Sequence, residues 1–266
     1  MQKKQALSFA LSQEELFVAL SYLKSREIAG LEIERLTALS DKEQSLVLGV
    51  AERALIARGF LIREPNMRSN LAAPILAVLG SCANPETSVI LSITYTNSHE
   101  EQYYFHSARK MRVIHTIPST TIHQFMAVED NTAMIHAILS ALSLADVKTR
   151  KLGTGKIAYN SLERARDIAL EQGSFKAKKI LSEELEMPLA EAFAEALTGV
   201  ISNATIVVIS QDDIKESQGF SILKGEESLW LMSPSGTSGN NTTSKIKVQA
   251  VSSNEVVELI QAIYAH

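Results

Sequence analysis

Histidine is the residue type whose placement most suggests chemistry in this chain. Five of the six histidines fall between His99 and His136, and three of them, His106, His115 and His123, lie on successive β-prone runs. Neighbouring strands of a sheet could bring these three imidazoles together as a metal site. No cysteine, aspartate or glutamate stands beside them at ligand spacing, and the sequence His-Glu-x-x-His is missing. We therefore expect histidines on the solvated face of a sheet, with no bound metal.

Other motifs for catalysis or nucleotide binding are incomplete. Gly155-Lys156 lacks the earlier glycine of a phosphate loop, since Arg150 stands at that position, and Ile157 replaces the required serine or threonine. The serine-rich segment SPSGTSG does not contain the Gly-x-Ser-x-Gly sequence of a nucleophile elbow. The lone Cys82 ends an apolar helix and is better explained as a small buried hydrophobe than as a nucleophile. The sequence therefore predicts a protein that is not an enzyme and needs no cofactor.

Composition limits the classes of partner and compartment. The chain has 266 residues, 45% of them apolar, which is close to the upper limit for one hydrophobic core. Its net charge of −4 gives no electrostatic reason to expect nucleic acid or an acidic membrane surface as a partner. A single cysteine cannot form an intramolecular disulfide, and no run approaches the ~20 apolar residues of a membrane span. We expect a cytoplasmic protein without membrane insertion.

The order of the expected elements repeats along the chain. Helix, three or four strands, helix describes residues 71–142 and also residues 188–264. The endings match best, with Ala127-Val128 beside Ala250-Val251, each followed by a turn and an amphipathic helix. We therefore predict a single α+β domain over residues 1–266. Its central antiparallel sheet is built from two pseudo-two-fold related halves, 1–145 and 160–266, and is flanked by helices.

The first helices leave an alternative open. Ser12 with Glu15 and Ser40 with Glu43 form capping boxes that predict two helix starts, and the second helix runs to Gly59 before a short strand. Helices followed by a strand also fit a winged helix, in which helix 41–58 would enter the major groove. The charges of that helix cancel: Lys42, Arg53 and Arg58 against Asp41, Glu43 and Glu52. A DNA-binding transcriptional regulator is therefore the alternative, weakened by the few phosphate contacts available.

Several segments resemble the EspG family, proteins associated with type VII (ESX) secretion. They are LSQEELFVALSYL near the start, DKEQSLVLGVAERALIARGFLI, NLAAPILAVLGSCANPETSVILSI, and SLWLMS with KIKVQAVSSNEVVELIQAIY at the end. The family's helix typically ends in an Ala-Leu-x-x-Arg-Gly-Leu-like phrase, which here runs from Ala54 to Phe60. The resemblance extends over almost the whole chain through pattern rather than rare motifs. One departure is Gly219-Phe220-Ser221-Ile222, where better-known members have an Asp…Gly-Arg-Tyr-like phrase.

The resemblance implies a cytosolic chaperone with a quasi-two-fold α+β fold and no catalytic residues. Members of the family bind the helical tip of PE–PPE substrate dimers, keep it soluble and deliver it to the secretion machine. For this chain it implies a helical secretion substrate as partner, either PE–PPE-like or of the WxG type. The family's contacts lie on loops of the sheet and on the C-terminal helices.

By position, the partner should contact the turn between Tyr95 and Gln102. We expect His99 in that turn and the following aromatic residues, Tyr103, Tyr104 and Phe105, to supply the contacts, because buried aromatic side chains dominate many interfaces. Packing of these aromatics within the sheet is the alternative. The oligomeric state is left open.

Overall fold

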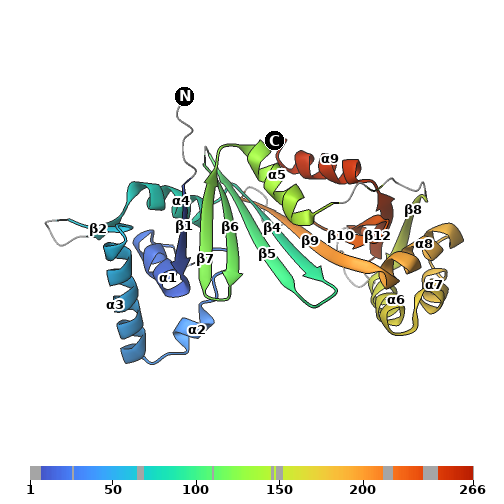
Figure 1. Ribbon diagram of the computed structural model, residues 1–266, viewed down its shortest axis with the longest axis horizontal. Coiled ribbons are helices and arrows are strands. Elements are labelled where there is room, and N and C mark those ends of the chain that lie inside the picture. Colours follow the sequence, from blue (N-terminus) through green and yellow to red (C-terminus); the bar gives the residue numbers. More distant parts are fainter. Residues whose placement is uncertain are drawn as a thin grey trace. The chain divides into compact units, whose positions relative to one another are not determined.

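The computed structural model describes residues 7–25, 27–64, 69–109, 111–144, 147, 152–211, 218–235 and 245–265 (Figure 1). The chain forms two compact units. Unit 1 contains Met1–Ile90, Gln102–Met134 and Ile209–Glu216, and unit 2 contains Leu91–Glu101, Ile135–Val208 and Ser217–His266. In the described part of the chain, no helix is both long enough and apolar enough to cross a membrane.

The helices and strands fall into two parts of the sequence. The first part contains β1 (Ser8–Ser12), α1 (Gln13–Tyr22), α2 (Glu34–Thr37), α3 (Asp41–Ala57), β2 (Leu61–Arg63), β3 (Ser69–Leu71), α4 (Ala73–Ala83), β4 (Thr87–Tyr95), β5 (Glu100–Ala108), β6 (Met111–Ser119), β7 (Ile122–Val128) and α5 (Asn131–Leu142). The second contains β8 (Thr154–Ala158), α6 (Tyr159–Gln172), α7 (Ser174–Leu181), α8 (Met187–Thr198), β9 (Val200–Ser210), β10 (Gln218–Gly225), β11 (Leu229–Ser235), β12 (Lys245–Val251) and α9 (Ser253–Ile263).

The predicted repeat of elements is confirmed and is longer than expected. The run α4, β4 to β7, α5 has the same order as the run α8, β9 to β12, α9. Each run is preceded by a strand and a helix, β1–α1 in the first case and β8–α6 in the second. Both leading strands pair with the last strand of their own run, β1 with β7 and β8 with β12, and both pairings are antiparallel. The prediction of an α+β fold with an antiparallel sheet is confirmed.

Local sequence sets the helix starts. In both predicted capping boxes the serine hydroxyl accepts from the backbone N–H three residues later, and the glutamate accepts from the serine N–H. A third box, Ser252 with Glu255, opens α9. Pro188 lies in the first turn of α8, where its missing N–H has no cost.

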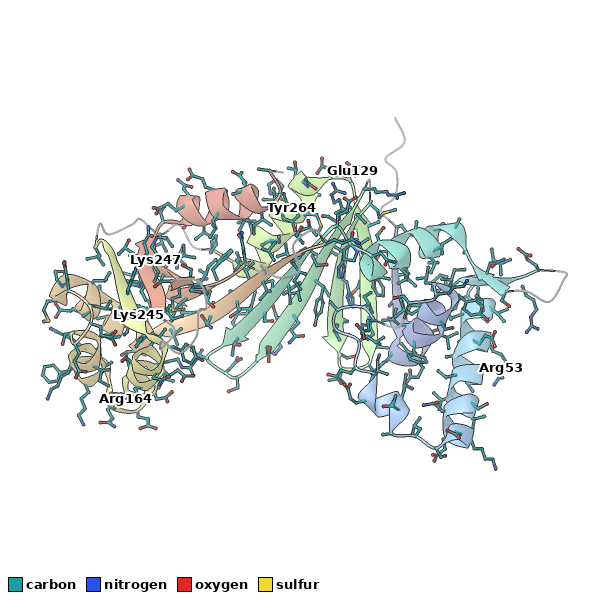
Figure 2. The ribbon with its side chains drawn as sticks, turned by 180° about the vertical axis from the view of Figure 1, so that it is seen from behind. Arg53, Glu129, Arg164, Lys245, Lys247 and Tyr264 are labelled. Atoms are coloured by element: carbon teal, nitrogen blue, oxygen red, sulfur yellow. The ribbon has the colours of Figure 1, made fainter. Side chains whose placement is uncertain are left out.

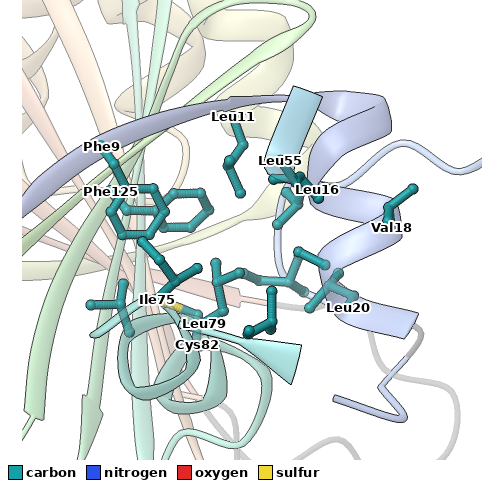
Figure 3. Close-up of a cluster of buried hydrophobic side chains, with 14 of the residues drawn as sticks. Phe9, Leu11, Leu16, Val18, Leu20, Leu55, Ile75, Leu79, Cys82 and Phe125 are labelled. Carbon is teal, nitrogen blue, oxygen red and sulfur yellow. The ribbon is translucent and has the colours of Figure 1, made fainter. Parts of the chain in front are cut away.

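In unit 1 the strand order is β1-β7-β6-β5-β4. Phe9 and Leu11 of β1 lie opposite Phe125 and His123 of β7. Figure 3 shows Phe9, Leu11 and Phe125 in one hydrophobic cluster with side chains from α1, α3 and α4. The phenyl rings of Phe9 and Phe125 stack with their centroids 5.4 Å apart. The cluster also contains Cys82, which is 3% exposed, so the prediction that this thiol is buried is confirmed.

Arg58 joins three parts of unit 1 just after the end of α3. One guanidinium nitrogen lies 2.8 Å from each carboxylate oxygen of Glu15, a buried residue of α1. The other terminal nitrogen donates to the carbonyl of Ala10 in β1. The guanidinium also lies 4.4 Å from the ring centroid of Phe60. Arg58 and Phe60, at the end of the EspG-like segment from Ala54 to Phe60, therefore link the end of α3 to α1 and β1.

Gly30 supports the burial of Tyr104 in unit 1. Its φ angle is +84°, and a Cβ placed on it would lie 2.7 Å from Cζ of Tyr104 and 2.8 Å from Cδ1 of Ile117. Gly59 also has a positive φ, +71°, but a Cβ there meets nothing within 4 Å. Alanine at Gly59 would therefore add only backbone strain, whereas alanine at Gly30 would add both backbone strain and steric overlap.

We expect Gly30→Ala to destabilise the protein by about 2 kcal/mol, because it adds overpacking to the strain of a left-handed backbone. Gly59→Ala, which adds the strain alone, should cost roughly 1 kcal/mol. Urea unfolding followed by circular dichroism measures both values. Equal losses for the two variants would contradict the close packing of Gly30 against Tyr104.

In unit 2 the strand order is β4-β9-β10-β11-β12-β8, with the end of β4 contributing to this unit. Trp230 of β11, Val248 of β12 and Ile157 of β8 are buried on one face of these strands. They belong to a core shared with α6, α7 and α8, in which the ring centroids of Trp230 and Phe193 are 4.8 Å apart. The three helices thus cover one face of the strands.

Two strands were not expected from the sequence. Both are five-residue strands, β1 and β8. Each ends at its helix, because Ser12 is the N-cap of α1 and Ala158 is the N-cap of α6.

Candidate functional site

The three clustered histidines come together, but inside the protein. His106, His115 and His123 are at most 1% exposed, so the expectation of solvated histidines is wrong. They lie side by side on β5, β6 and β7, on the face that packs against the helices of unit 1. Nε2 of His115 is 3.0 Å from Nδ1 of His123, and the His115 ring stacks between those of Tyr104 and Phe125.

Burial keeps these imidazoles neutral. It lowers the pKa of His106 and of His123 to about 4, and it lowers the pKa of His115 well below its usual value, with help from its two histidine neighbours. Nδ1 of His106 is 2.9 Å from the hydroxyl of Ser88. Within the described residues, no group of three or more histidine, cysteine or carboxylate side chains is arranged to hold a metal ion. The metal-free state of the protein stays a prediction.

Two of the expected aromatic contact residues are not on the surface. Tyr104 is 6% exposed and Phe105 is 1% exposed, so both pack within the protein as in the alternative considered from the sequence, and their contact with a partner stays a prediction. Tyr104 is covered by the segment around Gly30, and its hydroxyl donates to Gln102. Tyr103 is half-buried on the other face of β5, with its ring stacked along that of Phe105 at 6.3 Å. Its contact with a partner stays a prediction.

The expected turn is present and well bonded. β4 ends at Tyr95 and β5 begins at Glu100, with His99 exposed between them. The N–H of Tyr95 donates to the carbonyl of His99, and the two rings stack at 5.8 Å. Nε2 of His99 lies 3.4 Å from Glu101, whose carboxylate also accepts from the Tyr95 hydroxyl. The turn is therefore a rigid feature, and its use by a partner stays a prediction.

Helix α6 in unit 2 buries one side and exposes large apolar residues on another. Ala165 and Ala169 are buried against α7 and α8, and Leu162, on the same side, is partly buried against that core. Tyr159 and Leu170 lie on another side and are 44% and 62% exposed. A helix that only covered a core would carry its large apolar residues on one side. The second side borders a groove.

The groove lies where the helices stop covering the strands. The floor of the groove is one face of β9 and β10. Further along the sheet, the buried Trp230 of β11 lies on the same face. Asn203 and Thr205 of β9 and Ser221 of β10 place polar groups there, and the two hydroxyls of Thr205 and Ser221 are 3.2 Å apart. The carboxamide oxygen of Asn203 is buried and has no hydrogen-bond partner among the described residues.

The walls of the groove are mostly apolar. Its volume is 670 Å³, within the range of roughly 300–1,000 Å³ typical of ligand pockets. The lining comes from α6, α8, β9 to β12 and the end of β4: Thr94, Tyr95, Thr96, Tyr159, Leu162, Glu163, Arg166, Leu170, Leu197, Val200, Ile201, Ser202, Asn203, Thr205, Gly219, Phe220, Ser221, Leu223, Met232, Ser233, Pro234 and Ile246. Among the described residues, one acidic residue, Glu163, and one basic residue, Arg166, line the groove. Glu163 accepts a hydrogen bond from Tyr159, and this bond raises the pKa of that phenol.

This groove has the composition of a binding surface. A long apolar wall with a polar floor and single opposite charges matches the composition of protein interfaces. It adjoins the expected turn through Thr94, Tyr95 and Thr96. It also includes Gly219-Phe220-Ser221, the segment where the sequence departs from the EspG pattern. A second cavity in unit 2, beside Trp230, has a volume of only 190 Å³.

The order of elements defines an α+β protein with antiparallel strands and a repeated helix–strand–helix plan. No family model matches the sequence, and no curated protein matches it. A solved structure with the same fold is that of the Mycobacterium tuberculosis type VII secretion system chaperone EspG5 in complex with a PE25–PPE41 dimer. The match has a TM-score of 0.64 and covers 97% of this chain and 95% of the other, at 9% identity. The resemblance to the EspG family inferred from the sequence is therefore confirmed at the level of the fold.

Proposed function

We propose that this protein is a cytoplasmic chaperone or adaptor that binds a helical protein destined for type VII secretion. The observation that carries the proposal is the apolar groove of unit 2, on a chain with the fold of a chaperone whose structure was solved in complex with a PE25–PPE41 dimer. The partner class is PE–PPE-like or WxG-type. Its action is binding rather than catalysis, and no cofactor takes part.

The groove has the features that such a partner requires. A helix is about 10 Å across with its side chains, and one apolar stripe of it can lie against Tyr159 and Leu170 while its flanks remain in solvent. Asn203, Thr205 and Ser221 on the floor can then bond the polar groups that a helix tip leaves free. The rigid strands hold these groups in place before binding, which lowers the entropy cost of association.

Co-expression tests the proposal. The chain is produced with each PE–PPE-like pair and each WxG-type protein encoded near its own gene, and complexes are isolated by size-exclusion chromatography. We expect one of these partners to become soluble only with the chain and to elute with it as a complex of fixed stoichiometry. An unrelated helical bundle of similar size serves as the control. If every such partner is soluble alone and elutes separately, the proposed function is wrong.

A further inference from the structure

The internal repeat relates the strands of the two units residue by residue. Alignment of the matched endings, Ala127-Val128 and Ala250-Val251, places His123 of β7 on Ile246 of β12. The two strands that follow across each sheet, β6 and β5 or β11 and β10, keep the same register. Three positions on the helix-covered face of unit 1 therefore correspond to three positions of unit 2: Tyr104 to Ser221, His115 to Met232, and His123 to Ile246.

In unit 1 the chain itself covers this part of the sheet. Tyr104, the most exposed of its three residues, is only 6% exposed. Residues 27–33 form neither helix nor strand and connect α1 to α2. Within them the N–H of Leu31 donates to the carbonyl of Ile28, and this turn holds Gly30 against the Tyr104 ring. Both aliphatic residues of the turn pack into the core of unit 1.

In unit 2 the corresponding positions are open. Ser221, Met232 and Ile246 are only partly buried, and all three line the groove. Helix α6 is followed by α7 after the single residue Gly173, so the described residues from α6 to α8 contain no counterpart of the covering segment. The groove of unit 2 is therefore the place that unit 1 fills with its own chain.

The two units differ in the size of the strand residue at this place. In unit 1 the strand supplies the Tyr104 ring and the turn supplies Gly30, where a Cβ would lie 2.7 Å from that ring. In unit 2 the strand supplies only the hydroxymethyl group of Ser221. Because protein contacts are close-packed, a turn seated in the groove must itself supply a large side chain at this point.

We propose that Ser221 sets the size of the anchor residue that the groove accepts from its partner. The anchor is an aromatic side chain at the tip of an apolar turn between two helices of the partner, and it fills the space that the Tyr104 ring fills in unit 1. Met232 and Ile246 contact the aliphatic residues beside the tip. The inference rests on the function proposed above and specifies which part of the partner enters the groove.

Methyl NMR with two cyclic peptides tests this inference. One peptide carries residues 27–33 of this chain, EIAGLEI, closed through a short linker that keeps the turn. The matched peptide has phenylalanine in place of Gly30. Both are titrated against the full chain, and the methyl signals of Met232 and Ile246 report binding in the groove.

Two variants and a control separate the groove from the rest of the sheet. Ser221→Tyr supplies the ring from the strand, as in unit 1, and Ser221→Leu fills part of the same space. The control, Lys247→Tyr, adds the same ring next to Ile246 but on the opposite face of β12, where Lys247 is exposed and is labelled in Figure 2.

We expect the unaltered chain and the control to bind the phenylalanine peptide at least about tenfold more tightly than the glycine peptide, because only the former buries a ring in the groove. Ser221→Tyr should abolish or reverse this preference, and Ser221→Leu should reduce it. Equal affinities of the two peptides for the unaltered chain, no binding of the phenylalanine peptide, or an unchanged preference in both folded Ser221 variants would overturn the inference.

Failure of this inference is distinguishable from failure of the proposed function. If a helical partner elutes with the chain but the phenylalanine peptide does not bind, only the role of Ser221 is wrong. If the peptides bind with the expected preference but no partner is found by co-expression, the inference stands and the proposed function is wrong.

Discussion

Acidification from pH 7 to pH 4 is expected to unfold this protein. The pKa values of His106 and His123 fall from 6.5 in the unfolded chain to about 4 in the folded protein, and that of His115 also falls well below 6.5. Between pH 6.5 and pH 4, the unfolded chain therefore binds protons at these histidines that the folded protein does not bind. The stabilisation by these neutral rings is complete above pH 6.5 and is lost as the pH falls from 6.5 through 4.

The expected loss is large compared with the stability of a protein. A pKa displaced by one unit corresponds to about 1.4 kcal/mol, so His106 alone accounts for roughly 3 kcal/mol, and His115 and His123 act in the same direction. Native proteins are stable by only about 5–15 kcal/mol. Urea unfolding at a series of pH values, followed by circular dichroism, measures how the free energy of unfolding changes with pH.

Two kinds of variant separate the buried histidines from the exposed ones. His99→Gln and His136→Gln remove exposed imidazoles and should leave the pH dependence as it is. His115→Phe removes a buried imidazole from a stack of rings and should make the dependence shallower, whatever its effect at pH 7. A protein equally stable at pH 7 and pH 4 would show that these rings are not held neutral.

Replacing Arg58 should cost about 3 kcal/mol of stability. Arg58→Met keeps the aliphatic stem but removes the cation from Glu15, whose side chain is only 9% exposed. Breaking a buried ion pair by removing one partner typically costs about 3–5 kcal/mol, and the 39% exposure of Arg58 places this case near the lower end. The carbonyl of Ala10 and the ring of Phe60 also lose a partner.

The control for this variant is Arg53→Met, one turn earlier on α3, which should change the free energy of unfolding by less than about 0.5 kcal/mol. Glu15→Gln combined with Arg58→Met should cost less than the sum of the two single changes, because the unpaired carboxylate is gone. Additive losses would mean that the two side chains do not interact in solution.

Features determined by nearby residues could be predicted from the sequence. The capping boxes at Ser12 and Ser40 needed only four residues each, and the β-then-helix endings of the two runs needed about twenty. The strands β1 and β8 could not be found in this way. Each has five residues, and each is a strand because of a partner distant in the sequence, as with Phe9 opposite Phe125 and Ile157 opposite Ile246.

The site was only partly predictable for a similar reason. Histidine has no fixed preference for the surface, so His106, His115 and His123 could be placed inside only once the helices covering their face were known. Tyr104 and Phe105 look like contact residues in the sequence, but both faces of β5 are covered at this point. Leu162 and Leu170 gave no sign of facing a groove, because an apolar residue of a helix usually faces the core.

The central claim is that the groove of unit 2 binds the helical partner, and one pair of variants tests it most directly. Leu170→Glu places a charge on the wall of the groove, and Phe175→Glu makes a comparable change on the neighbouring α7 at a residue that is 82% exposed and outside the lining. Once a partner has been isolated, calorimetry gives both affinities. We expect Leu170→Glu to weaken binding at least roughly 30-fold, or about 2 kcal/mol, and Phe175→Glu to leave it unchanged. Full affinity in the folded Leu170→Glu variant would contradict the claim.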